Sequence, residues 1–305
     1  MHLNDLGERK LINRIWDKIG RKEEYDDCVY ILRGDHYELI TTDFIGEKTH
    51  FMKDWSPYLV GKFFASLNLS DIAAMGGVPE IFMASLFFSR DYPVDYLDDF
   101  IKGMNSLLEE FNTIYRGGDL KESLLGGMSG IAIGWVEKDK ILRRKGAMKD
   151  DGIYVTGELG KQAAGYYLWK NGVEEGYKYL LDIYPRVNEG RILAGRATSC
   201  MDISDGLNST INQMENINAL GFKIYFDELP IHKLAFEVSE DYGISIEHLV
   251  LEFGGEYELL YTSPEKIVGR EIGMVNKNGG IFKNGKLMKG GGYEHFSKIL
   301  DKIRE

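Results

Sequence analysis

Strand and helix patterns alternate along the whole of this 305-residue chain, and that alternation limits its fold more than any other feature. Short apolar runs bounded by turn residues predict strands, whereas apolar residues at helical spacing predict helices. Alternation in both halves is typical of an α/β or α+β protein. The length suggests two domains. Because the composition turns more basic after residue 137 (KDKILRRKGAMKD), we expect a first domain over 1–137 and a second over 138–305.

The individual elements follow from the same patterns. In the first half we predict helices over 6–20, 58–76 and 95–112, and strands over 28–33, 37–43, 81–88 and 126–136. In the second half we predict a strand–turn–helix at GIYVTGELGKQAAGYYL, a helical region over 160–196, a strand ending at MDISDG (201–206), a helix from about 206, and strands over 222–227 and 253–262.

The chain is acidic, with 37 Lys and Arg against 48 Asp and Glu and a formal net charge of −11. Such a surface repels nucleic acid and anionic membranes, so we expect neither as a partner. The lack of any run of ~18 apolar residues, and of an apolar signal stretch in MHLNDLGERK, predicts a cytoplasmic protein. Cys28 and Cys200 have no CxxC spacing, which excludes a disulfide framework and a cysteine zinc site; we interpret both as small core residues.

Aspartates recur beside small or hydroxyl residues at the ends of apolar strand patterns. The segments are YDDCVYI (25–31), LITTDF (39–44), RGGDL (116–120) and CMDISDGL (200–207). Strand ends are rigid, and several at one sheet edge can aim their carboxylates at one point. Because Mg²⁺ prefers carboxylate, water and phosphate oxygens, these segments predict a Mg²⁺ site that handles a phosphate-bearing substrate.

Asp71 lies on the apolar stripe of the helix predicted over 58–76. Val60, Phe64, Leu67, Asp71 and Met75 share one side of that helix by their spacing. A carboxylate inside such a stripe is costly unless it is paired or binds a metal. For Asp71 alone, a metal ligand and a structural aspartate bonded to backbone amides both stay open. The other aspartates favour the metal ligand.

Glycines and a basic run complete the candidate site. Gly117–Gly118 before Asp119, and Gly206 after Asp205, allow backbone N–H groups to approach phosphate oxygens, although a glycine pair is also typical of a turn. The run Arg143–Lys145 either clamps a phosphate or is a solvated charge run. Neither a Walker A motif nor a GxGxxG fingerprint is present, which argues against a P-loop or Rossmann site.

Eight segments occur in a recognisable order: LGERKLINRI, DDCVYI, TTDFIGEKTHF, NLSDIAAMGGVP, GGD, ILRRKGAMKDDGIYVTGELG, MDISDGL and GGEYELLYT. This ordered set spans residues 6–262 and resembles the thiamine-monophosphate kinases, which belong to the AIR-synthase-like ATP-binding superfamily. A weaker match follows at GGGYEHF (290–296). The resemblance implies two α/β domains, the first forming a dimeric β-barrel with its copy, and ATP sites near that interface. It also implies direct transfer of the γ-phosphoryl group of ATP onto thiamine monophosphate.

The resemblance further assigns roles to residues by motif. The residues that resemble Mg²⁺ ligands are Asp27, Thr41, Thr42, Asp43, Asp71, Asp119, Asp202 and Asp205. Gly118, Asp119, Arg144 and Ser204 resemble ATP contacts, and His50 and Glu256 resemble contacts to the thiamine substrate. Several Mg²⁺ ions supply the alignment and charge neutralisation that phosphoryl transfer needs, so we expect no side-chain nucleophile.

Three positions depart from the family pattern. Tyr25 replaces the glycine before the first aspartate pair, GGEDYELL is shortened to GGEYELL, and Gly290 stands where an aromatic residue stacks on the thiamine ring. These departures leave open the phosphate acceptor and the group that stacks on it; the number of Mg²⁺ ions is open as well. Two alternatives remain: another AIR-synthase-like ATP-dependent enzyme with a different acceptor, and a catalytically inactive nucleotide-binding regulator. The intact aspartate set argues against the second.

Overall fold

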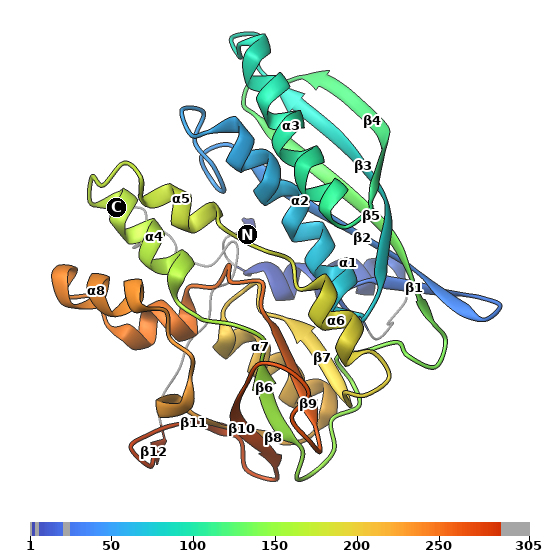
Figure 1. Ribbon diagram of the computed structural model, residues 1–305, viewed down its shortest axis with the longest axis vertical. Helices are drawn as coiled ribbons and strands as arrows, with labels where there is room; N and C mark the ends of the chain where they lie inside the picture. The colour runs from blue at the N-terminus through green and yellow to red at the C-terminus, as the bar shows by residue number, and fades with distance from the viewer. Residues whose placement is uncertain (1, 4–5, 21–24, 288–305) are drawn as a thin grey trace.

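Two β-sheets, one from each half of the sequence, form the framework of the protein (Figure 1). The computed structural model describes residues 2–3, 6–20 and 25–287. The first sheet has the strand order β1-β2-β5-β3-β4, and the second has the order β12-β11-β8-β10-β6-β9-β7. Because the sheets divide between residues 137 and 152, we keep the domains 1–137 and 138–305 as a proposal.

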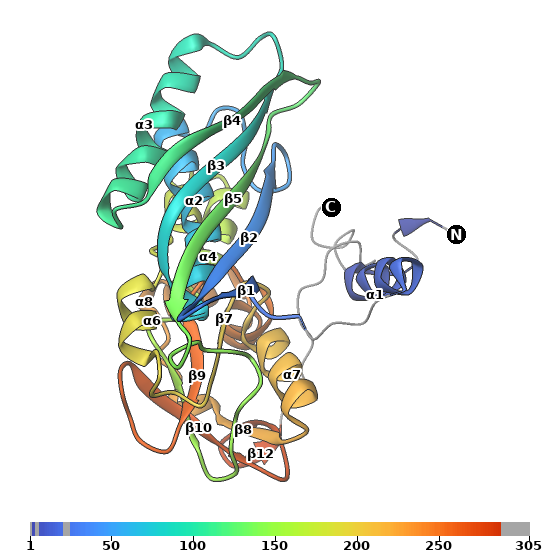
Figure 2. The ribbon, with the colours of Figure 1, turned by 90° about the vertical axis from the view of Figure 1, so that its right-hand side faces the viewer.

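The first sheet carries helices on one face only. Its strands are β1 (Val29–Arg33), β2 (His36–Gly46), β3 (Val78–Phe88), β4 (Ile114–Glu122) and β5 (Gly127–Glu137), and its helices are α2 (Pro57–Ala74) and α3 (Val94–Glu110), preceded by α1 (Glu8–Ile19). Figure 2 shows α2 and α3 behind this sheet, while no element in the described part of the chain covers its other face. The predicted elements of this half are confirmed. Strand β4 was not predicted, because Gly117 and Gly118 are typical of a turn but lie inside the strand at a shift in its register.

The second sheet is built from shorter strands. They are β6 (Gly152–Val155), β7 (Ser199–Asp202), β8 (Gly221–Tyr225), β9 (Leu259–Ser263), β10 (Arg270–Asn276), β11 (Gly280–Lys283) and β12 (Lys286–Leu287). The α-helices of this half are α4 (Lys161–Lys170), α5 (Gly176–Leu181), α6 (Val187–Leu193), α7 (Leu207–Asn218) and α8 (Lys233–Tyr242), with short helical turns at Phe226–Glu228 and His248–Glu252.

The predicted strand over 253–262 is wrong in its first part. Strand β9 begins only at Leu259, because Gly254, Gly255 and Tyr257 all have positive φ angles, outside the β region that a regular strand uses. A Cβ at Gly254 would overlap backbone atoms of the 204–206 turn. This glycine therefore permits two backbone segments to pack together, and the same contact occupies the space beside Gly206.

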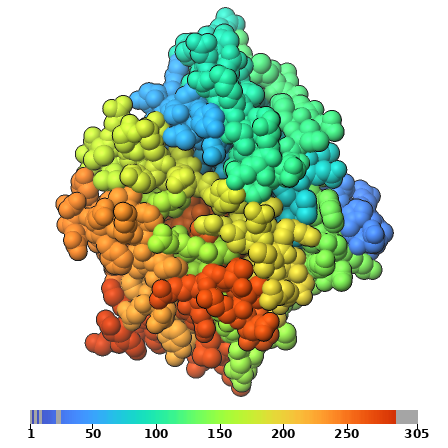
Figure 3. All heavy atoms as spheres, in the orientation of Figure 1, coloured from blue at the N-terminus to red at the C-terminus, as the bar shows by residue number. Residues whose placement is uncertain are grey.

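Helix α2 joins the two halves. It packs against strands β2, β3 and β5 on one side and against α5, α6 and β7 of the second half on another. The predicted apolar stripe is buried, but the helix is buried nearly all round, including polar Ser66, Asn68 and Ser70. One continuous hydrophobic core contains residues of both halves. In Figure 3 the atoms of the yellow-green to yellow region around α5 and α6 lie directly against those of the first half.

Two smaller expectations can be compared with the structure. Cys28 and Cys200 are free thiols in the core, as predicted. Among the helices of the described residues, none is both long and apolar enough to cross a membrane.

The uncovered face of the first sheet is apolar. Register pairs connect Val29, Ile40, Ile133, Ile81 and Ile114 into one row across all five strands. Directly paired residues point to the same side of a sheet. The row is half-exposed to exposed along its whole length. A band of five aliphatic side chains in water is a feature of surfaces that bind another protein.

Helices α2 and α3 approach each other through glycine. A Cβ added at Gly103 would overlap the carbonyl oxygen of Tyr58, and one added at Gly61 would overlap that of Phe100. We predict that Gly103→Ala lowers the free energy of unfolding by about 1–3 kcal/mol, because the helices must move apart. Urea unfolding followed by circular dichroism measures this loss. Asp98→Ala, at an exposed position on the same helix, is the control and should change stability little; equal stability of Gly103→Ala and the wild type would contradict the prediction.

Candidate active site

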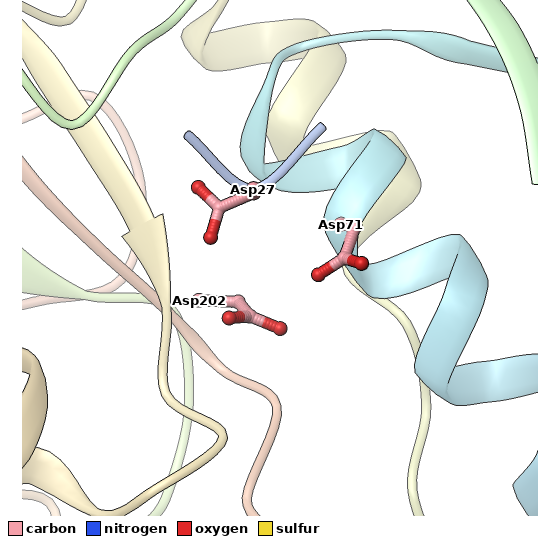
Figure 4. A group of neighbouring side chains, drawn as sticks. All are labelled: Asp27, Asp71 and Asp202. Atoms are coloured by element: carbon pink, nitrogen blue, oxygen red, sulfur yellow. The ribbon is translucent and has the colours of Figure 1, made fainter. Parts of the chain in front are cut away.

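Three carboxylates from distant parts of the sequence meet between the two sheets. Oxygen atoms of Asp27, Asp71 and Asp202 lie within 4.8 Å of one another. Figure 4 shows the three side chains converging from the segment before β1, from α2 and from the end of β7. The fold thus brings together three of the aspartates that the sequence singled out.

Their positions on the secondary structure differ from the expectation. Only Asp202 ends a strand, whereas Asp27 precedes β1, Asp43 lies inside β2 and Asp205 follows β7 in a turn. Asp71 comes from the last turn of α2. The site therefore lies where the beginning of one strand, the end of another and the end of a helix meet, and not at one sheet edge.

Hydroxyl groups and one guanidinium orient the carboxylates. The Thr41 hydroxyl donates a short hydrogen bond to Asp71, and Ser70 Oγ donates to Asp202 Oδ2 at 2.7 Å. Arg144 donates to Asp27 Oδ1 from Nη2 at 2.6 Å and from Nε at 3.2 Å. The other oxygen, Asp27 Oδ2, is buried and accepts no hydrogen bond. A buried carboxylate oxygen without a donor is costly unless a cation binds it.

Crowding of negative charge changes the protonation of the cluster. Burial, and then the charge of Asp27, raises the pKa of Asp202 to about 8. Burial and Asp205 raise the pKa of Asp43 to about 6, and burial with Asp43, Asp202 and Asp27 raises that of Asp71 well above its usual range. The cluster therefore repels its own charges and is suited to bind a multivalent cation.

Thr42 and Asp119 lie away from this cluster. In neighbouring strands Asp119 is paired with Ser85, Ser85 with Ser129, and Ser129 with Phe44. Because paired residues point to the same side of a sheet, the Asp119 side chain points to the uncovered face, as that of Thr42 does. Three strand spacings separate β2 from β4, about 14 Å. Asp119 instead pairs with Lys121, which lowers the pKa of its carboxyl group. The structure does not join these two residues to the cluster within one chain, and their role as ligands stays a prediction.

A pocket of about 460 Å³ lies between α3 and β4. Its lining is mainly apolar, with Leu97, Ile101 and Tyr115, and it also includes Gly118 and Asp119. Two predicted ATP contacts thus border one apolar hollow, although the Asp119 side chain points to the opposite face of the sheet. The other two predicted ATP contacts lie elsewhere. Arg144 contacts Asp27. Ser204 lies in the turn beside Asp205, and the Ser204 carbonyl accepts a hydrogen bond from Gly255 N.

Glu256 lines a second pocket, of about 430 Å³, in the second half of the chain. Its side chain is buried; Oε1 accepts from Gly160 N at 3.3 Å, and Oε2 has no partner. Burial raises its pKa to about 8. Glu258 lines the same pocket and is held by Arg186, with Nη2–Oε1 at 2.5 Å and Nε–Oε2 at 2.7 Å. The pocket therefore offers an acceptor or donor oxygen to a polar organic group.

His50 lies in the turn after β2. Its Nδ1 accepts a hydrogen bond from Gly46 N at 3.2 Å and contacts Thr49 Oγ1 at 2.8 Å. The remaining expectation, at Gly290 and GGGYEHF, lies outside the described residues. The assignments of His50 and Glu256 to an acceptor stay predictions.

Several residues of the site were not predicted. Asp26 accepts from Arg144 N at 3.0 Å, and burial with Asp27 raises its pKa to about 7. Asn68 accepts from Asp43 N at 3.2 Å. Buried polar residues at 66, 68 and 70 on a helix that is otherwise apolar were the available signal, because such side chains need partners.

Comparison with known proteins agrees with the fold. Residues 25–136 match the family model of the AIR synthase related protein, N-terminal domain. A thiamine-monophosphate kinase of Aquifex aeolicus (strain VF5) is 31% identical, over 97% of this chain and 100% of its own length. One of Pyrococcus horikoshii is 29% identical over 92% of each chain.

A solved structure supports the same relationship. The structure described as AaThiL complexed with AMPPCP and TMP has a TM-score of 0.90 to this chain at 30% sequence identity, and it covers 97% of this chain and 99% of its own. The AIR-synthase-like α/β fold with its two sheets is therefore confirmed. The similarity in sequence and in fold shows that the chain belongs to the thiamine-monophosphate kinase family.

Proposed function

We propose that this protein transfers the γ-phosphoryl group of ATP to thiamine monophosphate and so forms thiamine diphosphate, with Mg²⁺ bound at the aspartate cluster. One observation carries the proposal: Asp27, Asp71 and Asp202 converge within 4.8 Å, in a chain 31% identical over its length to a thiamine-monophosphate kinase. Two phosphate-bearing anions must meet in this reaction, so positioning and charge neutralisation dominate catalysis.

The residues present fit a hard divalent cation. The donor set is oxygen only, Asp27 Oδ2 has no other partner, and burial followed by repulsion from Asp27 raises the pKa of Asp202. Asp27, Asp71 and Asp202 would hold Mg²⁺, with Asp43 and Asp205 beside them, and the ion would neutralise phosphate charge. Ser70 orients Asp202 by its hydrogen bond.

The nucleotide and the acceptor take different pockets in this proposal. The apolar hollow at Gly118 and Asp119 suits a purine base. Arg144, with its planar fork of donors, suits a phosphate. The pocket at Glu256 suits the polar ring of the acceptor, because a partnerless buried carboxyl oxygen is available there. Although GGEYELL is one residue shorter than the family motif, Glu256 and Glu258 both line this pocket.

We also propose that two copies pair through the uncovered face of the first sheet. The aliphatic row centred on Ile133 would be buried by the partner, and burial of apolar surface favours association. Thr42 and Asp119 lie on the same face, so pairing would bring these predicted ligands to the interface between copies.

The central test is ADP release in the presence of ATP and Mg²⁺. We expect it to depend on thiamine monophosphate and to fall about 100-fold or more in Asp202→Asn, because one metal-binding charge is lost. The control is Asp139→Asn, an exposed carboxylate in a turn. ADP release without thiamine monophosphate would favour a different acceptor, and none at all would favour a regulator. An Asp202→Asn rate above about a tenth of the wild-type rate would contradict the metal assignment.

Stability should depend on pH and Mg²⁺ together. The pKa of Asp202 is about 8 and that of Asp43 about 6 in the folded protein, both raised from 3.8. A carboxyl group whose pKa is higher in the folded than in the unfolded protein contributes its full stability at pH values below the unfolded-state pKa. This contribution is lost as the pH rises through the folded-state pKa. Without metal, the melting temperature should therefore fall between pH 5 and pH 8, and Mg²⁺ should raise it more at pH 8 than at pH 6. Differential scanning calorimetry measures both; an equal Mg²⁺ effect at the two pH values would argue against the cluster as the site.

Pairing through the sheet predicts a dimer that one charge disrupts. Ile133→Asp should shift the mass measured by light scattering from that of two chains to that of one, because a carboxylate would be buried without a partner. Val94→Asp, on the exposed start of α3 away from this face, should remain dimeric. A monomeric wild type, or a dimer that survives Ile133→Asp, would refute this interface.

A further inference from the structure

Arg144 is the cation that pairs with Asp27, a buried carboxylate of the cluster. Its side chain is 12% exposed and that of Asp27 is 0% exposed. Two of its nitrogens donate to Asp27 Oδ1, Nη1 donates to Gln213 at 3.2 Å, and its backbone N–H donates to Asp26. The side chain is therefore held in place from several directions.

Arg144 and a divalent cation need the same carboxylate. Asp27 Oδ1 is taken by the guanidinium, while Oδ2 is buried and has no partner. Asp71 and Asp202 lie within metal-binding distance of Asp27. A dication at this point would stand close to a fixed positive charge in a site with little water, where repulsion between cations is strong.

The surroundings of Arg144 form a pocket that suits an anion other than Asp27. This pocket, of about 310 Å³, is lined by three cationic residues, Arg143, Arg144 and Lys145, together with Asp26, Tyr25 and Tyr30 among others. The cationic side chains of this pocket stand out in a protein of net charge −11, so they attract an anionic group to the pocket. A phosphate there would accept a forked pair of hydrogen bonds from the guanidinium in place of Asp27.

Tyr25 limits how far the Arg144 side chain moves when it exchanges Asp27 for a phosphate. Its ring lies 5.6 Å from the guanidinium carbon of Arg144, in a cation–π arrangement that favours the charged group on that side. The ring would keep Arg144 beside the pocket when it leaves Asp27.

We propose that Arg144 is a built-in competitor for divalent cations at Asp27, and that a nucleotide phosphate removes this competition by taking over the guanidinium. Metal and nucleotide would then bind cooperatively, since each is favoured by the same displacement of Arg144, and the coupling is reciprocal. The inference rests on the proposed metal site but not on the identity of the phosphate acceptor.

The test is Mn²⁺ binding to metal-free full-length protein, followed by the electron paramagnetic resonance signal of free Mn²⁺. Without nucleotide, Arg144→Gln should bind Mn²⁺ more tightly than the wild type, by about 5- to 150-fold, the usual range of such couplings. Lys138→Gln removes the same charge from an exposed turn outside this pocket, and should leave the affinity nearly unchanged. Equal or weaker Mn²⁺ binding by Arg144→Gln would overturn the proposal, because a purely structural Arg144 gives that result.

Adding AMPPCP provides the second measurement. In the wild type and in Arg144→Gln alike, contacts between Mn²⁺ and the nucleotide increase the Mn²⁺ affinity. The difference between the two increases therefore reports the effect of Arg144. We expect the nucleotide to increase Mn²⁺ affinity more in the wild type than in Arg144→Gln; the same increase in both would count against the exchange. If Arg144→Gln does not fold, Arg144→Lys keeps the charge but loses the fork. It should show a smaller gain in metal affinity of the same sign, and no gain would contradict the proposal.

These outcomes separate the inference from the proposed function. A protein with another phosphate acceptor would give the same Mn²⁺ results, because no acceptor is present in the experiment. Failure of the wild type and Arg144→Gln alike to bind Mn²⁺ would refute the metal site and this inference together.

Discussion

Repulsion among buried carboxylates is the constraint on which the rest of this structure depends. Burial raises the pKa of Asp71 and of Asp202, and the charge of Asp27 raises both further, so these carboxylates would separate if their supports allowed it. Asp71 also lies in the last turn of α2, where the helix dipole disfavours an anion. The surrounding core must therefore be rigid enough to hold these groups in place; in the proposed function a cation and a phosphate would neutralise them.

Helix α2 supplies much of that rigidity. It is buried by the first sheet and by helices of the second half at once, and the hydrophobic core continues across it. Ser70 and Asp71 are adjacent in sequence, yet one reaches toward Asp202 and the other accepts from Thr41. Helix α2 thus fixes the position of Thr41, in the first sheet, relative to Asp202, in the second sheet. A movement of one half of the chain relative to the other would therefore change the site directly.

Much of the local structure was predictable because local forces produce it. The i, i+4, i+7 spacing around Asp71 placed that carboxylate in a buried helix, and the alternation of apolar residues placed Thr41 and Asp43 on a strand. The failures were equally local. Gly117 and Gly118 favour a turn on their own, but pairing with β3 resumes at Gly118 after a register shift and keeps both residues inside β4. The positive φ of Tyr257 in the 254–257 loop has no signature in a single sequence.

The sequence by itself determined the alternating fold, the family and the set of acidic residues available for chemistry, because periodicity and motif order are properties of neighbours along the chain. Only the tertiary structure decided which of those residues meet. Thr41 and Thr42 are adjacent, yet side-chain alternation sends one to the buried cluster and the other to the open face. Asp27, Asp71 and Asp202 are distant in sequence, yet packing around α2 joins them. Contact between distant residues depends on how sheets and helices pack, and that is a property of the whole core.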